Sequence, residues 1–305
     1  IFLFTLLFFS ASPMIYCQIQ YDYGFKKDFS VSTNDQSGNP LAYAWAGGMN
    51  SCHFSELDLN LDGINDMVVF DKTGNKILTF INNNLPDSVS YSYDAYYQKF
   101  FPALNGWAHF IDYNNDQKND IFTYVPGGIA VYKNISDTIL KFQLMYPMLN
   151  SDMGSSSSNI MVTNDDYPAI QDLDGDGDLD ILVFFGLGTF LEMHQNLSQE
   201  LSGNNDTLLY ELSYHCWGDF AESSLDNSLS LNVTCPWRND TVNPDKATRH
   251  VGSTMLADDF NGDGLIDMIL GDVDYFNLIK LTNGGTADSA HIISQDTLFP
   301  SNTTP

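Results

Sequence analysis

The stretch DLDGDGDLDILVF, residues 172–184, decides the fold. Its first nine residues hold five aspartates, and an apolar run of strand-forming residues follows directly. Two unit charges about 4 Å apart repel by roughly 4 kcal/mol at an effective dielectric constant of about 20. Like charges crowded beside a segment that should be buried therefore predict either a solvated disordered run or a loop that encloses a cation.

The same nine-residue frame occurs four times along the chain. The copies are DLNLDGIND (58–66), DYNNDQKND (112–120), DLDGDGDLD (172–180) and DFNGDGLID (259–267). Positions 1, 5 and 9 are aspartate in every copy, and position 3 is aspartate or asparagine. Position 6 is glycine in three copies, which eases the positive φ of a sharp turn, and Gln117 in the second copy. We therefore expect the second loop to be the weakest site and the third, with its five carboxylates, the tightest.

Position 7 shares no side-chain type among the copies, so we expect it to act through its backbone carbonyl, as calcium loops do at that place. Oxygen donors at the other positions suit a hard cation, which takes about six to eight ligands. The sequence predicts about three to four Ca²⁺ ions per chain. The predicted ligands at positions 1, 3, 5, 7 and 9 are Asp58, Asn60, Asp62, Ile64 and Asp66; Asp112, Asn114, Asp116, Lys118 and Asp120; Asp172, Asp174, Asp176, Asp178 and Asp180; and Asp259, Asn261, Asp263, Leu265 and Asp267.

The loops are not EF-hands, because an EF-hand has a glutamate at position 12 and helices on both sides. Position 12 is Val69, Thr123, Val183 or Leu270. Each loop is followed by an apolar strand-type run such as MVVF at 67–70. Aspartate at position 9 is therefore expected to close the site.

The repeat continues beyond the loop. Each copy has a turn and a second strand that ends in asparagine, at Asn82, Asn134, Asn196 and Asn283. These lie 24, 22, 24 and 24 residues after the first aspartate of the loop. Four strands per unit predict an all-β protein, a β-propeller of four-stranded blades, with an insertion at about 197–250.

These residues resemble the FG-GAP/VCBS repeats of integrin-α-type β-propellers, and Trp45 to Gly48 are similar to the lead-in of secreted bacterial repeat proteins of the Bacteroidota kind. The resemblance covers residues 44–305. It implies one calcium-binding hairpin loop per blade and, commonly, seven blades, of which about four are visible here. The chain thus looks like a fragment at both ends. Gln117 and the missing literal FG and GAP words depart from the pattern.

Residues 1–17 read as a secretory signal peptide without its charged start, and residues 18–43 as a lead-in to the propeller. The alternative, a transmembrane helix, needs about 20 apolar residues, and Pro13 interrupts this run. We therefore expect a secreted or cell-surface protein with no membrane insertion after cleavage. In an oxidising compartment Cys216 and Cys235 could pair, which leaves Cys52 over.

The formal net charge of −27, with 12 Lys and Arg, excludes nucleic acid as a partner, because neutralising phosphates takes a basic surface. No HExxH, GxSxG or P-loop motif occurs, so no catalytic residues are predicted. The leading hypothesis is a binding or adhesion module for extracellular protein or polysaccharide ligands in which calcium is structural. The alternative is the propeller scaffold of a secreted polysaccharide lyase or hydrolase. The ligand and the oligomeric state are left open.

Overall fold

The computed structural model describes residues 31–41, 43–185, 189–223, 228–235, 253–287 and 289–300. The chain divides into two compact units, Ile1–Leu41 and Ala42–Pro305. In the first unit, the described residues form a turn in which Asn34 pairs with Pro40. The predicted signal peptide lies outside the described residues.

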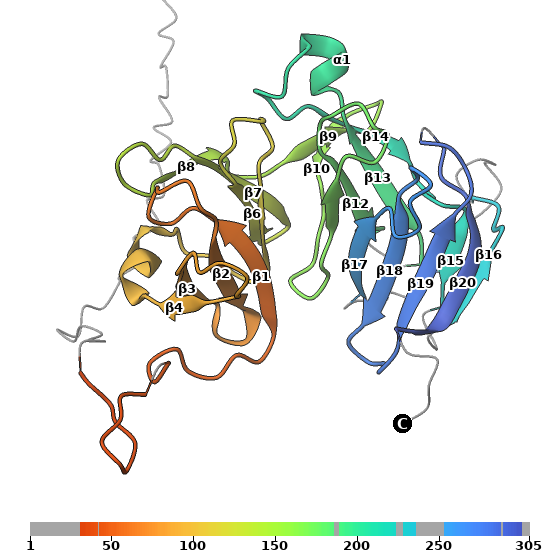
Figure 1. The fold of residues 1–305 in the computed structure, drawn as a ribbon. Coiled ribbons are helices and arrows are strands. Elements are labelled where there is room, and N and C mark those ends of the chain that lie inside the picture. Colours follow the sequence, from red (N-terminus) through yellow and green to blue (C-terminus); the bar gives the residue numbers. More distant parts are fainter. Residues whose placement is uncertain are drawn as a thin grey trace, which may run out of the picture. The chain divides into compact units, whose positions relative to one another are not determined.

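The second unit is built almost entirely of antiparallel strands (Figure 1). The first sheet holds β1 (Cys52–Leu57), β2 (Asp66–Asp71), β3 (Lys76–Asn82) and β4 (Tyr91–Tyr93). The second holds β5 (Ala108–Ile111), β6 (Asp120–Val125), β7 (Gly128–Asn134) and β8 (Phe142–Tyr146). Two short 3₁₀ helices, η1 (Lys72–Gly74) and η2 (Ala95–Phe100), lie in the connections of the first sheet.

The third sheet is larger than the others. Its strands β11 (Ala169–Gln171), β12 (Asp180–Phe184), β13 (Leu191–Asn196) and β14 (Tyr210–Tyr214) are followed on the β14 side by β9 (Asn150–Asp152) and β10 (Ser157–Asn159). The fourth sheet holds β17 (Ser253–Asp258), β18 (Asp267–Asp272), β19 (Leu278–Asn283) and β20 (Ile292–Phe299).

Each acidic loop joins the first and second strands of one sheet. In the first sheet Leu57 pairs with Asp66 across the loop, and Asp258 pairs with Asp267 in the fourth. Position 9 therefore begins the second strand every time. In all four sheets the third strand ends at the asparagine that follows each loop at a nearly constant distance. These residues are Asn82, Asn134, Asn196 and Asn283.

Consecutive sheets bury their faces against each other, which is why the second strands are apolar without strict alternation. One hydrophobic cluster joins the first and second sheets through Phe70 and Ile121, among others. A second joins sheets two and three, and a third joins sheets three and four. Fully burying one such large apolar side chain contributes about 1.5–3 kcal/mol.

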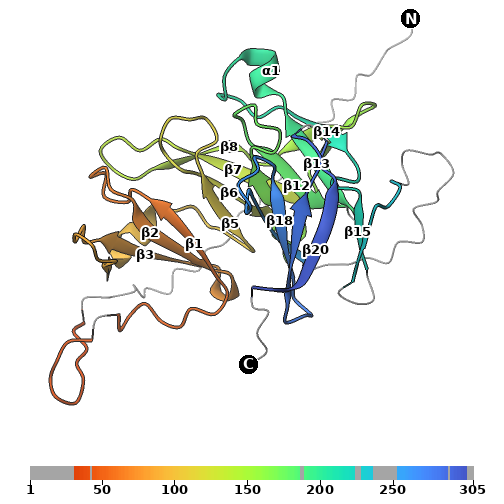
Figure 2. The ribbon, with the colours of Figure 1, turned by 45° about the vertical axis from the view of Figure 1, so that its right-hand side comes forward.

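The first strands of the sheets lie innermost. Tyr167 forms a bridge with Thr254 of β17, and its ring lies 4.3 Å from that of His53 on β1 and 4.2 Å from that of His109 on β5. In Figure 2 the second sheet lies beside the first, and the fourth sheet overlaps the third. Antiparallel four-stranded sheets that pack face to face around their first strands form a β-propeller arrangement with four blades, as the sequence predicts.

The segment predicted as an insertion contributes to this scaffold. It begins with α1 (Ser198–Ser202) and then supplies β14, which pairs with the free side of β13 as the fourth strand of the blade. A small hairpin of β15 (Phe220–Glu222) and β16 (Leu229–Leu231) follows, and Cys216 and Cys235 form a disulfide. Cys52 is a half-buried free cysteine. Among the described residues, no helix is long and apolar enough to span a membrane.

Candidate functional site

The first aspartate of each acidic loop binds the backbone of its own turn. Its Oδ2 accepts the amide of position 6, at N···O distances of 2.8, 2.7, 3.1 and 2.8 Å in chain order. The aspartate at position 5 accepts the amide of position 7 at 2.9, 3.1, 2.9 and 2.9 Å. These repeated bonds hold the side chains of positions 1 and 5 against the backbone of their own loop.

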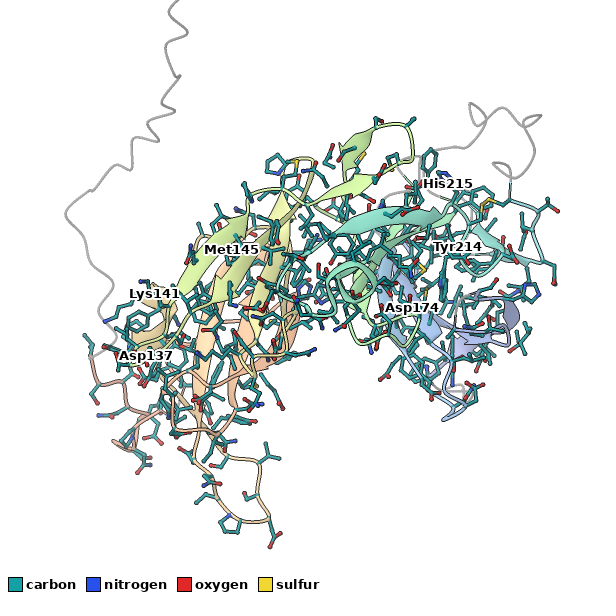
Figure 3. The ribbon with its side chains drawn as sticks, turned by 90° about the horizontal axis from the view of Figure 1, so that it is seen from above. Asp137, Lys141, Met145, Asp174, Tyr214 and His215 are labelled. Carbon is teal, nitrogen blue, oxygen red and sulfur yellow. A yellow bond between two sulfur atoms is a disulfide. The ribbon has the colours of Figure 1, made fainter. Side chains whose placement is uncertain are left out.

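The third loop brings three of its predicted carboxylate ligands together. Carboxylate oxygens of Asp172, Asp174 and Asp176 all lie within 4.8 Å of one another. Figure 3 shows Asp174 from above, at the loop end of the third sheet. Gln195, on β13, donates a hydrogen bond of 2.6 Å to Asp174 Oδ2. Positions 1, 3 and 5 of this loop therefore offer several carboxylate oxygens to one point.

Two positions of each loop have left-handed backbone. Position 6 has a positive φ in all copies, including Gln117 at 66°, as the sequence predicts. Position 4 also has a positive φ, which the sequence analysis missed. The residues there are Leu61 (61°), Asn115 (57°), Gly175 (84°) and Gly262 (79°). The signal was present in three of the four copies, because glycine and asparagine favour this conformation.

The aspartate at position 9 fastens the loop to the sheet. It is buried in every copy, as Asp66, Asp120, Asp180 and Asp267. Its Oδ1 accepts the amide of the strand-ending asparagine at 2.8, 2.7, 2.8 and 2.9 Å. In the first three copies Oδ2 accepts the amide of position 2 at 2.9, 3.2 and 3.0 Å.

The asparagine completes this fastening. In three copies its Nδ2 donates to the carbonyl of position 8 at 3.1 Å. The nearly constant distance from the loop to the asparagine in the sequence is therefore explained by the hydrogen bonds that join the asparagine to positions 8 and 9 of the loop. Position 9 was predicted only as a cation ligand, and the structure gives it this second role.

Burial opposes ionisation of several loop carboxyls. Desolvation raises the pKa of Asp120 to about 7 and that of Asp180 to about 8, while backbone hydrogen bonds act in the other direction. Desolvation also raises the pKa of Asp178 to about 7. By contrast, backbone hydrogen bonds, that from Gly264 foremost, lower the pKa of the exposed Asp259. A divalent cation beside the buried groups would favour their ionised form.

The donor set fits a hard cation, because every predicted side-chain ligand is a carboxylate or an amide oxygen. Asn114 Oδ1, at position 3 of the second loop, is buried and accepts no hydrogen bond from any residue that the structure describes. Lys133, on β7, has its Nζ 3.5 Å from Oδ2 of Asp116 in this loop. An ammonium group beside a ligand competes with a bound cation, which gives a second reason to expect the second loop to be the weakest.

A cleft of about 720 Å³ lies beside the third sheet, between the β9–β10 hairpin and the segment from α1 to β14. Its volume falls in the range of small-molecule sites. Carboxylates of Asp152 and Glu211, neighbours across the β9–β14 pairing, line it together with Ser155 to Ser157. Leu201 and Leu209 add apolar surface. No lysine or arginine lines it among the described residues.

His53 and His109, near the inner strands, are partly buried, and His194 on β13 is buried; none of the three lines the cleft. Desolvation lowers the pKa of His53 to about 4 and that of His109 to about 3. His109 contacts the Pro168 carbonyl at 3.0 Å, and His194 contacts Ser151 Oγ at 2.9 Å. These neutral imidazoles pack and hydrogen-bond within the scaffold.

No protein-family model matches the chain, and no curated protein matches it. Among solved structures, a similar chain belongs to a study of the recognition of non-reducing terminal N-acetylglucosamine by an Agrocybe aegerita lectin. The two are 13% identical over 87% of this chain and 73% of that chain, with a TM-score of 0.38, which is too low to carry an argument. The β-propeller arrangement of this chain follows from its own sheet order, strand register and shared hydrophobic clusters.

Proposed function

We propose that this chain is an extracellular calcium-binding β-propeller of the FG-GAP/VCBS type that acts as a binding or adhesion module. The observation that carries the proposal is the repeated loop, in which one hydrogen-bond pattern recurs four times and, in the third copy, three carboxylates converge. The role of calcium is structural. Positions 1, 3, 5, 7 and 9 of one short loop can supply most of a coordination shell, which leaves little room for a substrate.

The metal proposal is tested by calorimetric titration of the chelated protein with Ca²⁺. We expect three to four ions to bind at the acidic loops, with a rise in melting temperature. Saturation at a hundredfold excess over Kd corresponds to about 2.7 kcal/mol of stabilisation per site. No uptake at millimolar Ca²⁺ would contradict a calcium-binding propeller.

The ligand proposed for the cleft is a short neutral saccharide. Asp152, Glu211 and the serine hydroxyls of Ser155 to Ser157 offer many hydrogen-bond acceptors, which suit a ligand rich in hydroxyl donors. Leucine side chains can cover the apolar faces of sugar rings. The two carboxylates and the lack of a lining cation among the described residues disfavour uronate-rich or sulfated polysaccharides.

Calorimetry with panels of neutral and acidic oligosaccharides, in calcium, tests this ligand class. We expect binding within the neutral panel, weakened at least tenfold by Glu211→Ala. Gln143→Ala, an exposed β8 position outside the lining residues, is the matched control and should bind as the parent does. Preference for the acidic panel, or equal binding by Glu211→Ala, would rule out the cleft. Release of reducing ends would instead favour a polysaccharide-degrading enzyme.

A further inference from the structure

The α1 segment is fastened to the third acidic loop, and no other copy has such an element within the described residues. The amide of Gln199 donates to Asp178 Oδ2 at 3.1 Å. Asn205, buried just beyond the helix, donates from Nδ2 to the carbonyl of Gly177 at 2.7 Å. These contacts bring Glu200 of α1 to the loop.

Three carboxylates meet at this contact. Oxygen atoms of Asp176, Asp178 and Glu200 all lie within 4.8 Å of one another. Asp178 is completely buried, and its Oδ1 has no hydrogen-bond partner among the described residues. An ionised carboxylate buried without a partner costs several kcal/mol unless a cation or donor reaches it. This buried oxygen is therefore available to a cation that reaches the three carboxylates.

In the second copy, position 7 of the loop carries a positive charge instead of a carboxylate. There, position 7 is Lys118, and its Nζ donates to the carbonyl of Ser136 at 2.6 Å. Ser136 corresponds to Ser198 of the third copy, because each serine lies two residues after the strand-ending asparagine and donates to its Oδ1. In the second copy, the ammonium group of Lys118 thus joins the loop to the segment that follows the third strand. In the third copy, both the loop and the following segment carry carboxylates, Asp178 and Glu200.

We propose that Asp176, Asp178 and Glu200 form a second cation site, separate from the site inside the third loop and sharing Asp176 with it. Carboxylate oxygens alone select a hard divalent cation, and Ca²⁺ suits their number and flexible geometry. The backbone carbonyl of Asp178 serves the loop site, and its side chain serves the second site. The bound ion joins α1 to the loop as the Lys118 ammonium does in the second copy. The first and fourth loops lack this site, because Ile64 and Leu265 occupy position 7.

Calorimetric titration with Ca²⁺ tests this site on the full chain. The parent should bind one ion more than Glu200→Gln and one more than Asp178→Asn. Asp206→Asn, which removes an exposed charge from the same segment, is the matched control and should bind the parental number. Equal stoichiometry in the parent, Glu200→Gln and Asp178→Asn would overturn the proposal.

A double variant separates two ions from one shared ion. Asp172 belongs only to the loop site, so Asp172→Asn should lose one ion, and Asp172→Asn/Glu200→Gln should lose two. A double variant that loses only one ion would show that the carboxylates share a single cation, and the second site would be rejected. A parent that binds no Ca²⁺ would contradict the proposed function itself, which is a distinguishable result.

Discussion

At the scale of single residues, each loop requires a left-handed backbone conformation at position 6, even where the residue is not glycine. Position 6 is left-handed in every copy, and Gln117 adopts φ 66° where the other copies have glycine. A residue with a Cβ in this conformation costs roughly 1–2 kcal/mol relative to glycine. The second loop therefore stores strain that the other three lack at this position.

Gln117→Gly should stabilise the protein by about 1 kcal/mol, because it removes this strain. The gain should appear in chemical denaturation both with calcium and with EDTA, since the turn is left-handed in either condition. Gln143→Gly, within strand β8, should instead destabilise by about 0.5–1 kcal/mol. A loss of stability in Gln117→Gly would mean that the Gln117 side chain makes a stabilising contact that outweighs the strain.

At the scale of the structural element, each blade depends on two kinds of aspartate. Those at position 5 bond to the backbone of their own loop, whereas those at position 9 are buried and accept the amide of the strand-ending asparagine and, in the first three copies, an amide of the loop. The first kind should matter through calcium, and the second kind should matter whether or not calcium is present.

Asp120→Ala should lower the free energy of unfolding by about 3 kcal/mol, because the amides of Tyr113 and Asn134 lose their buried acceptor. The loss should persist in EDTA. Asp176→Ala should lower the melting temperature in calcium and change it little in EDTA. If both variants lose stability only in calcium, position 9 acts through the metal and not through the backbone.

The sequence predicted the blade well because its strongest constraints are local. The spacing of Asp58, Asp112, Asp172 and Asp259 located every hairpin, and Gln117 was recognised as the exceptional turn residue. The position of Glu200 beside Asp176 was not predictable, because it depends on how a non-repeated segment folds back onto one loop. Similarly, Lys133 beside Asp116 joins residues on different elements, which no spacing rule specifies.

At the scale of the whole molecule, charge sets the conditions for stability. The formal net charge is −27, and four bound Ca²⁺ ions would reduce it to −19. Burial raises the pKa of Asp120 to about 7 and that of Asp180 to about 8, above about 3.9 for an unfolded aspartate. Without a cation, the folded state therefore binds more protons than the unfolded state up to about pH 8, and stability falls as pH rises through this range.

Two histidines act in the opposite direction at lower pH. The pKa values of His53 and His194 are lowered to about 4, so their contribution rises with pH up to about 6.5, the value of an unfolded histidine. The two trends oppose each other below about pH 6.5. Above about pH 6.5 these histidines no longer oppose the carboxyl contribution. The effect of the buried carboxyls on the free energy of unfolding can therefore be measured above that pH.

We therefore expect the chelated protein to lose stability on the order of 2 kcal/mol between about pH 6.5 and pH 8.5. Saturating Ca²⁺ should abolish or reverse this loss, because ions bind the ionised carboxylates and release their protons. Urea denaturation at both pH values, in EDTA and in calcium, measures the four free energies. Asp120→Asn/Asp180→Asn should show a flatter pH dependence in EDTA. A parent whose stability in EDTA rises over this interval would mean that these carboxyls are ionised in the folded, metal-free chain.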